Sequence, residues 1–147
     1  RYVSYNYREN HWSIGSLART AGVDAGVFIY PNMVGTDSKI YEHEVGFDYD
    51  SATVFAESGP IEIGAGDRLM VAKSLIPDEK TQGDVTAKFK TRLYPNATES
   101  THGPYTMANP TSVRFTGRQV EMRVEGNIGA DWRVGTMRLD VAQGSRR

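Results

Sequence analysis

The stretch VRFTGRQVEMRVEGNIGADWRVGTMRLDVAQGSRR, from Val113 to Arg147, decides the fold class. Residues 120–125 read VEMRVE, so apolar and charged side chains alternate strictly. Because successive side chains of a strand point to opposite faces, this pattern predicts a strand with one apolar and one charged face. A second apolar set follows in residues 134–141 and is interrupted at Gly135, where we expect a bulge or a close approach. We interpret the stretch as a hairpin-like end of the chain that packs against something else.

The rest of the chain also reads as strands separated by turn residues. Alternating or apolar runs occupy residues 1–7, 12–17, 27–30, 40–45, 54–56, 61–63, 67–76 and 85–93. No segment keeps an apolar period of 3.6 residues over ten or more positions, so the sequence predicts an all-β fold.

The composition changes near residues 59–66, where aromatic-rich segments give way to longer strands with alternating charges. We therefore expect a β-propeller blade fragment over residues 1–57, followed by a β-sandwich-like platform over residues 58–147. Within the platform, residues 94–110 contain three Pro, two Asn and several Ser and Thr. This composition predicts an irregular loop and a mobile insertion.

Length, composition and net charge restrict the class of protein to which the chain can belong. The chain has 147 residues, 39% of them hydrophobic, and a formal net charge of −1, which fits a globular fold and disfavours nucleic-acid binding by charge alone. It has no cysteine, so disulfides, thiol nucleophiles and cysteine metal sites are excluded, and a reducing compartment is favoured. No run approaches the roughly 18 apolar residues of a membrane span. Because residues 2–7 already alternate like a strand, we expect the chain to be a piece of a longer protein.

No motif points to catalysis or to a metal. His11, His43 and His102 each lack a second ligand at metal-binding spacing. Asp48 and Asp50 are not followed by the glycine and the glutamate of a calcium loop. A glycoside hydrolase would need two paired carboxylates, and no pair can be chosen by spacing. We therefore expect no enzyme activity, no cofactor and no metal site.

Six segments together resemble the carboxy-terminal part of the tail nozzle or tail tubular proteins of short-tailed bacteriophages, also called DNA-stabilisation or tail accessory proteins. The segments are YNYRENHWSIGSLART (5–20), IYEHEVG (40–46), SGPIEIGAGD (58–67), LIPDEKTQGDV (75–85), FTGRQVEMRVEG (115–126) and DWRVGTMRLDVAQGSRR (131–147). The most specific pieces are Gly117-Arg118-Gln119 and Trp132-Arg133-x-Gly135. The loop over residues 94–110 has no counterpart in this resemblance.

The resemblance implies a structural virion protein with a propeller-like part and β platforms. Such proteins form a ring, usually a hexamer, below the portal and the adaptor, and they extend the channel through which the genome leaves. The implied partners are copies of the chain, adaptor or portal-proximal proteins, tail fibres or spikes, and double-stranded DNA that passes without specific binding. Assembly would take place in the cytoplasm of the bacterial host. A near-neutral charge agrees with this role, because a strongly basic channel would hold DNA.

A ring needs two different complementary faces on each subunit, because its contacts are heterologous. All seven basic residues from Val113 onward are Arg, a side chain suited to bidentate contacts with carboxylates at interfaces. The candidate interface residues are Arg118, Arg123, Arg133 and Arg138. Their expected partners on a neighbouring subunit are acids such as Glu57, Glu62, Asp78 and Glu79.

The alternative function is a carbohydrate-binding or receptor-binding β-module of a phage tail. Aromatic side chains exposed on a sheet can stack against sugar rings, and Trp12, Tyr30 and Tyr105 are the candidates. The competing interpretation is that these rings fill the core, as the Trp between propeller blades does.

Overall fold

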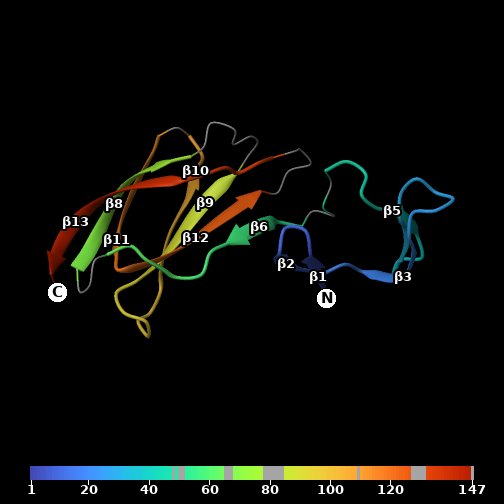
Figure 1. Ribbon diagram of the computed structural model, residues 1–147, viewed down its shortest axis with the longest axis horizontal. Coiled ribbons are helices and arrows are strands. Elements are labelled where there is room, and N and C mark those ends of the chain that lie inside the picture. The colour runs from blue at the N-terminus through green and yellow to red at the C-terminus, as the bar shows by residue number, and fades with distance from the viewer. Residues whose placement is uncertain are drawn as a thin grey trace. The chain divides into compact units, whose positions relative to one another are not determined.

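The computed structural model describes residues 1–47, 49, 52–64, 68–77, 85–108, 110–126 and 132–146. In these ranges the structure contains thirteen strands and no helix, which confirms the predicted all-β fold class (Figure 1). The chain divides into two compact units, Arg1–Gly46 and Phe47–Arg147.

The N-terminal unit contains two small antiparallel sheets. One is a hairpin of β1 (Tyr2–Asn6) and β2 (His11–Gly15). The other has the strand order β3 (Arg19–Val23), β4 (Asn32–Gly35) and β5 (Ile40–Glu42).

Side-chain hydrogen bonds hold the turn of the β1–β2 hairpin. The Oδ1 atom of Asn6 accepts the backbone N–H groups of Arg8 (3.1 Å) and Glu9 (3.2 Å). Asn10 has a φ of 55°, a left-handed conformation that Asn tolerates better than most residues. Local turn chemistry therefore fixes this hairpin, although among the described residues of the unit only Gly35 is buried.

The C-terminal unit contains two larger antiparallel sheets. The first has the order β10–β9–β12–β6, and β7 also pairs with β12; the second has the order β11–β8–β13. The strands are β6 (Val54–Glu57), β7 (Ile61–Glu62), β8 (Arg68–Ile76), β9 (Thr86–Arg92), β10 (Ser100–Thr106), β11 (Thr111–Gly117), β12 (Gln119–Gly126) and β13 (Arg138–Arg146). The propeller-blade and β-sandwich assignments stay predictions.

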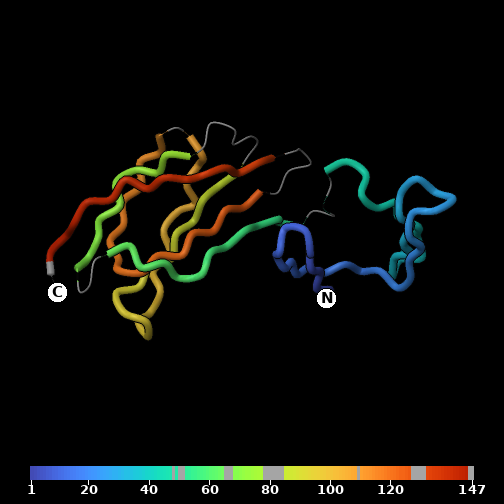
Figure 2. Tube along the Cα trace, viewed as in Figure 1, coloured from blue at the N-terminus to red at the C-terminus, as the bar shows by residue number. Residues whose placement is uncertain are grey.

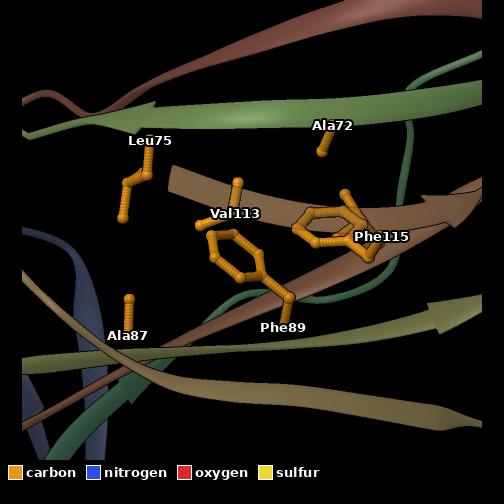
Figure 3. Packing of buried hydrophobic residues seen from close by; sticks show 7 residues of the cluster. Ala72, Leu75, Ala87, Phe89, Val113 and Phe115 are labelled. Atoms are coloured by element: carbon orange, nitrogen blue, oxygen red, sulfur yellow. The ribbon is translucent and has the colours of Figure 1, made fainter. Parts of the chain in front are cut away.

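The hydrophobic core lies between these two sheets (Figure 3). Phe89 of β9 and Phe115 of β11 come from opposite sheets, and their ring centroids are 4.8 Å apart. The other buried members of the cluster are Ala72, Leu75, Ala87, Val113 and Val120. Burial alternates along β9 and β12, so the strict alternation of the sequence places one face of each strand in the core and the other face in contact with solvent.

The expected hairpin at the end of the chain is wrong. β12 pairs with β9 and β6 in one sheet, whereas β13 pairs with β8 in the other (Figure 2). The alternation itself is correct, because Val124 is buried and Leu139 and Val141 pack against the core. An alternating pattern identifies the buried face of a strand but leaves its pairing partner open.

The expected boundary between residues 57 and 58 differs from the observed division between Gly46 and Phe47. Strand β6 pairs with β12, with Glu57 opposite Arg123 and Val54 opposite Gly126. This pairing makes residues 54–57 part of the C-terminal unit.

The expected irregular loop over residues 94–110 is also wrong, because β10 occupies residues 100–106. β10 lies at the edge of its sheet and pairs with β9, and the register shifts between His102 and Tyr105. Pro104 falls in this irregular part of the strand. Proline is tolerated on edge strands and at bulges because it has no N–H group to donate to a neighbour.

Candidate functional site

Two of the four candidate interface arginines form ion pairs within the chain. Arg118 lies between β11 and β12, and its Nε atom donates to Oε1 of Glu62 at 2.8 Å. Arg123 of β12 lies 3.1 Å from Oε2 of Glu57 and 2.5 Å from Oε1 of Glu125. The acids Glu57 and Glu62 were expected as partners on a neighbouring subunit, and the structure pairs them inside one subunit instead.

The guanidinium group of Arg123 is further fixed by an aromatic ring. Its Cζ atom lies 3.6 Å from the centroid of Phe55, which belongs to the neighbouring strand β6. A cation over an aromatic face is attracted by the ring quadrupole. Arg123 therefore holds β6 against β12 through Glu57 and through Phe55.

These contacts belong to a larger charged face on the side of the sheet that points away from the core. Lys88 contacts Glu125 at 2.7 Å, Lys90 contacts Glu57, and Arg92 contacts Glu121 at 2.5 Å. Arg92 also lies 2.5 Å from Glu99. The face therefore alternates positive and negative groups across β9, β12 and β6, and its charges neutralise one another.

The network shifts the ionisation of its members. The hydrogen bond from Lys90 lowers the pKa of Glu57 below its ordinary 4.5, and a contribution from Arg123 acts in the same direction. The hydrogen bond from Lys88 likewise lowers the pKa of Glu125. Glu57 in turn raises the pKa of Lys90 above its ordinary 10.5. These ion pairs therefore stay charged throughout the neutral range.

The other two candidate arginines, Arg133 and Arg138, are exposed. Arg133 precedes β13, and Arg138 is its first residue, opposite Ile76 of β8. Of the four candidates, these two have the most exposed side chains. Asp78 and Glu79 lie outside the described residues.

The three aromatic candidates for sugar stacking do not share one surface. Trp12 of β2 is 69% exposed and packs against Tyr5 across the hairpin, with ring centroids 4.5 Å apart. Tyr30 lies between β3 and β4 and is exposed. Tyr105 of β10 is half-buried against Phe89 in the core of the C-terminal unit. Only Trp12 and Tyr30 therefore present a ring to solvent.

Most of the exposed apolar side chains belong to the N-terminal unit. Among the described residues, those of this unit are Tyr2, Val3, Tyr5, Tyr7, Trp12, Ile14, Leu17, Val23, Val27, Phe28, Ile29, Tyr30, Val34, Ile40 and Val45. Val27 is 99% exposed and Ile29 is 84% exposed, in the segment between β3 and β4. The sequence predicts a strand here and offers Tyr30 for sugar stacking; the signal for an exposed apolar segment is the run VFIY, which has no alternating polar face.

Two of the three histidines form hydrogen bonds within the chain. The Nε atom of Arg19 donates to Nε2 of His43 at 3.0 Å, and His102 is hydrogen-bonded to Thr91 at 3.0 Å. The ring of His102 also stacks on Phe115, with centroids 5.3 Å apart. In the part of the chain that the structure describes, no group of three or more His, Cys, Asp or Glu could hold a metal ion.

The depression on the outer side of β8 and β11, with a volume of about 510 Å³, was not found from the sequence. Lys73 and Arg114 contribute its charged groups. The only sequence signal for it is the outward position of Arg114 in the alternating segment VRFTG.

The described residues contain no helix long and apolar enough to cross a membrane. Comparison with known protein families, with curated proteins and with solved structures finds no match.

Proposed function

We propose that the chain is a structural component of a bacteriophage tail, in which copies of it form part of the ring-shaped nozzle that extends the genome-ejection channel. The resemblance of six segments to tail nozzle proteins supports the identity of the assembly. The observation that carries the proposal is the N-terminal unit, which forms strands but leaves fifteen large apolar side chains exposed.

Such a surface is unfavourable in water. A two-stranded hairpin is marginally stable by itself, and burial of apolar area supplies most of the stability of small domains. Large exposed apolar patches on folded proteins mark interaction sites. Burial against neighbouring subunits would therefore stabilise the strands of residues 1–46.

The C-terminal unit suits the role of a rigid platform. Its core is closed between two sheets, and the charged face of β9, β12 and β6 is neutralised within the chain. A neutralised face has little attraction for the phosphates of passing DNA. In the ring, the exposed Arg133 and Arg138 would contact acids of the next subunit, whereas Arg118 and Arg123 hold the platform together.

The test is the assembly state of the 147-residue chain, measured by sedimentation velocity and by negative-stain electron microscopy over a range of concentrations. We expect ring-shaped oligomers, usually hexameric in the resembled family. The variant Ile29→Ser should weaken assembly because it places a hydroxyl in the buried contact. The matched control is Ile61→Ser, which makes the same change at an exposed residue of the C-terminal unit and should assemble normally.

Two results would contradict the proposal. One is a parent chain that stays monomeric at every concentration. The other is an Ile29→Ser chain that assembles as well as the parent.

The second candidate function, sugar binding, is favoured by the exposed ring of Trp12, which lies beside the ring of Tyr5. Two neighbouring aromatic rings offer an apolar face on which a sugar can stack. A glycan array with the purified chain tests it, and the variant Trp12→Ala should abolish saturable binding. A nozzle protein should give no saturable signal on the same array.

A further inference from the structure

A shallow depression of about 510 Å³ lies on the sheet formed by β11, β8 and β13. It is lined by Val71, Ala72, Lys73, Ser112, Arg114, Phe115 and Thr116. Phe115 and Ala72 are buried in the core below, whereas Lys73 and Arg114 are exposed. The depression therefore opens on the outer face of this sheet, and its lining contains two cations and no acid.

The depression lies at an irregularity in strand pairing. Ser112 is opposite Ser74 and Phe115 is opposite Ala72, so two residues of β11 face the single residue Lys73 of β8. The register of β13 against β8 shifts at the same place, between the partners of Ser74 and Ala72. Bulges of this kind reorient side chains and occur often beside functional sites.

The bulge brings the two cations together. Of the two residues opposite Lys73, Val113 is fully buried in the core, and Arg114 lies on the exposed side with Lys73. Like charges directly opposite each other on neighbouring strands destabilise a sheet. Both cations line the same depression, so an anion bound there would offset their repulsion.

Neither cation has a partner in the described part of the chain. The structure contains no ion pair or hydrogen bond of the Lys73 ammonium or the Arg114 guanidinium with any described residue, and Asp140, opposite Ser74 on β13, forms none with them. The other sheet shows the opposite arrangement, since Lys88, Lys90 and Arg92 all contact glutamates.

We propose that this depression is a binding site for a tetrahedral oxyanion, a phosphate or a sulfate group. The guanidinium of Arg114 supplies a planar fork of N–H donors, and the ammonium of Lys73 supplies a compact positive charge. The hydroxyls of Ser112 and Thr116 line the same depression and can donate to further oxygens of the anion. The inference is independent of the proposed role in a phage tail.

A small anion fits this site better than a polynucleotide does. Binding of duplex DNA relies on many cations spread along the phosphate backbone. Here two cations are concentrated at one depression, the outer face of the other sheet is neutralised, and the net charge of the chain is −1. One oxyanion group matches the charge of the two cations.

The experiment is a titration of the 147-residue chain, labelled with ¹⁵N, with inorganic phosphate at constant low ionic strength. We expect saturable chemical-shift changes at the amides around residues 71–73 and 112–116. A monosaccharide phosphate titrated in parallel distinguishes a free phosphate ion from a phosphate group carried by a larger ligand. Tighter binding of the sugar phosphate indicates the larger ligand, whereas equal binding of the two indicates the free ion.

The variants Arg114→Gln and Lys73→Gln should each weaken phosphate binding about fivefold or more, because each removes a charge-assisted donor. The matched control is Arg68→Gln, which removes an arginine from the same strand as Lys73 but outside the depression and should leave binding unchanged. Shifts that do not saturate, or an equal loss in Arg68→Gln, would overturn the proposal. A short DNA duplex added as a competitor would also overturn the proposal if it bound at a lower concentration, counted in phosphate groups, than inorganic phosphate does. The ligand would then be a nucleic acid.

Discussion

The two units of this chain use the same kind of strand but bury very different amounts of it. In the described residues, the N-terminal unit exposes fifteen large apolar side chains and the longer C-terminal unit exposes six. Both units have regular antiparallel pairing. A sequence can therefore form paired β-strands without forming a buried core, and only the C-terminal unit has both.

The difference follows from the patterning of the strands. In β9 and β12 the residues that face the core alternate with polar and charged residues, and all of the core-facing residues except Thr91 are apolar, so the two strands form a buried face and a largely charged face. In the N-terminal unit, the exposed apolar residues lie both in the strands, as Val3 of β1 and Ile14 of β2 do, and outside them, as in the VFIY run of residues 27–30. We expect the stability of the isolated chain to come from residues 47–147.

The largest expected effect is that of Phe89→Ala in the C-terminal core. Phe89 is 1% exposed and packs against Phe115 and Tyr105. Truncation of a buried Phe lowers the free energy of unfolding by about 3–5 kcal/mol because it removes apolar contacts and leaves a cavity. Urea denaturation followed by far-ultraviolet circular dichroism measures the change.

The matched control for this variant is Val27→Ala, at a residue that is 99% exposed. A surface substitution of this kind should change the free energy of unfolding by less than about 0.5 kcal/mol. Equal destabilisation by the two variants would contradict the view that the C-terminal unit supplies the core.

The second expected effect concerns the contact of Gly126 with Trp132. A Cβ atom on Gly126 would lie 2.6 Å from the indole ring, so Gly126→Ala must displace the ring. Overpacking of this kind costs about 1–3 kcal/mol. The displacement should shift the fluorescence of Trp132 to longer wavelength, measured in a Trp12→Phe background so that one tryptophan is observed.

Gly59→Ala is the control for Gly126→Ala, because a Cβ atom at Gly59 would meet nothing within 4 Å. We expect unchanged fluorescence and unchanged stability in this variant. A blue shift or no shift in Gly126→Ala would mean that the close approach of Trp132 does not restrict this position.

Local patterning predicts which face of a strand is buried, but it does not predict which strands pair with each other. The alternation VEMRVE identifies the buried and exposed faces of β12 correctly, because the period of a strand is two residues. The same alternation cannot tell whether β13 pairs with β12 or, across the core, with β8, since both choices bury Leu139 and Val141. The segment that contains Pro104 was expected to be a loop, but edge strands and bulges accept proline. Whether a strand lies at the edge of its sheet depends on the tertiary structure, which local sequence does not show.

The ion pairs of the candidate site could not be predicted from the sequence for the same reason. The sequence placed Arg118 and Arg123 among four candidate arginines and Glu57 and Glu62 among their acidic partners, with the contacts expected between subunits and no pairs assigned. The structure pairs Arg118 with Glu62 and Arg123 with Glu57 within the chain. The sequence could not decide between contacts within one chain and contacts between chains, because that depends on the antiparallel register that places Glu57 opposite Arg123. The pair Lys73 and Arg114 depends on a bulge, which alternation does not encode.

The third expected effect tests whether the ion pairs of the C-terminal unit stabilise it. Hydrogen bonds from Lys90 and Lys88 lower the pKa of Glu57 and Glu125 below the ordinary 4.5. A group whose pKa is lowered by folding contributes stability above its unfolded pKa, and that stability is lost as the pH falls through the folded value. The free energy of unfolding should therefore be constant near neutrality and decrease below about pH 4.

Glu57→Gln removes one charge from this network and should lower the free energy of unfolding at pH 7 by about 1 kcal/mol. It should also flatten the decrease in acid, because a neutral amide does not titrate. Thermal denaturation between pH 2.5 and 7 compares the variant with the parent. An unchanged acid slope would assign the pH dependence to other carboxyl groups.

The smallest expected effect on global stability is that of Trp12→Ala, and the contrast between the two tryptophans makes it informative. Trp12 faces Tyr5 across the β1–β2 hairpin, and an aromatic pair of this kind contributes about 0.5–1.5 kcal/mol locally. Because the N-terminal unit has so little buried apolar surface, that local loss should weaken the hairpin and leave the unfolding midpoint of the C-terminal unit unchanged. Trp132→Ala, in contrast, should lower that midpoint, because its ring packs on the buried Gly126. If Trp12→Ala lowered the midpoint as much as Trp132→Ala does, the two units would have to unfold as one.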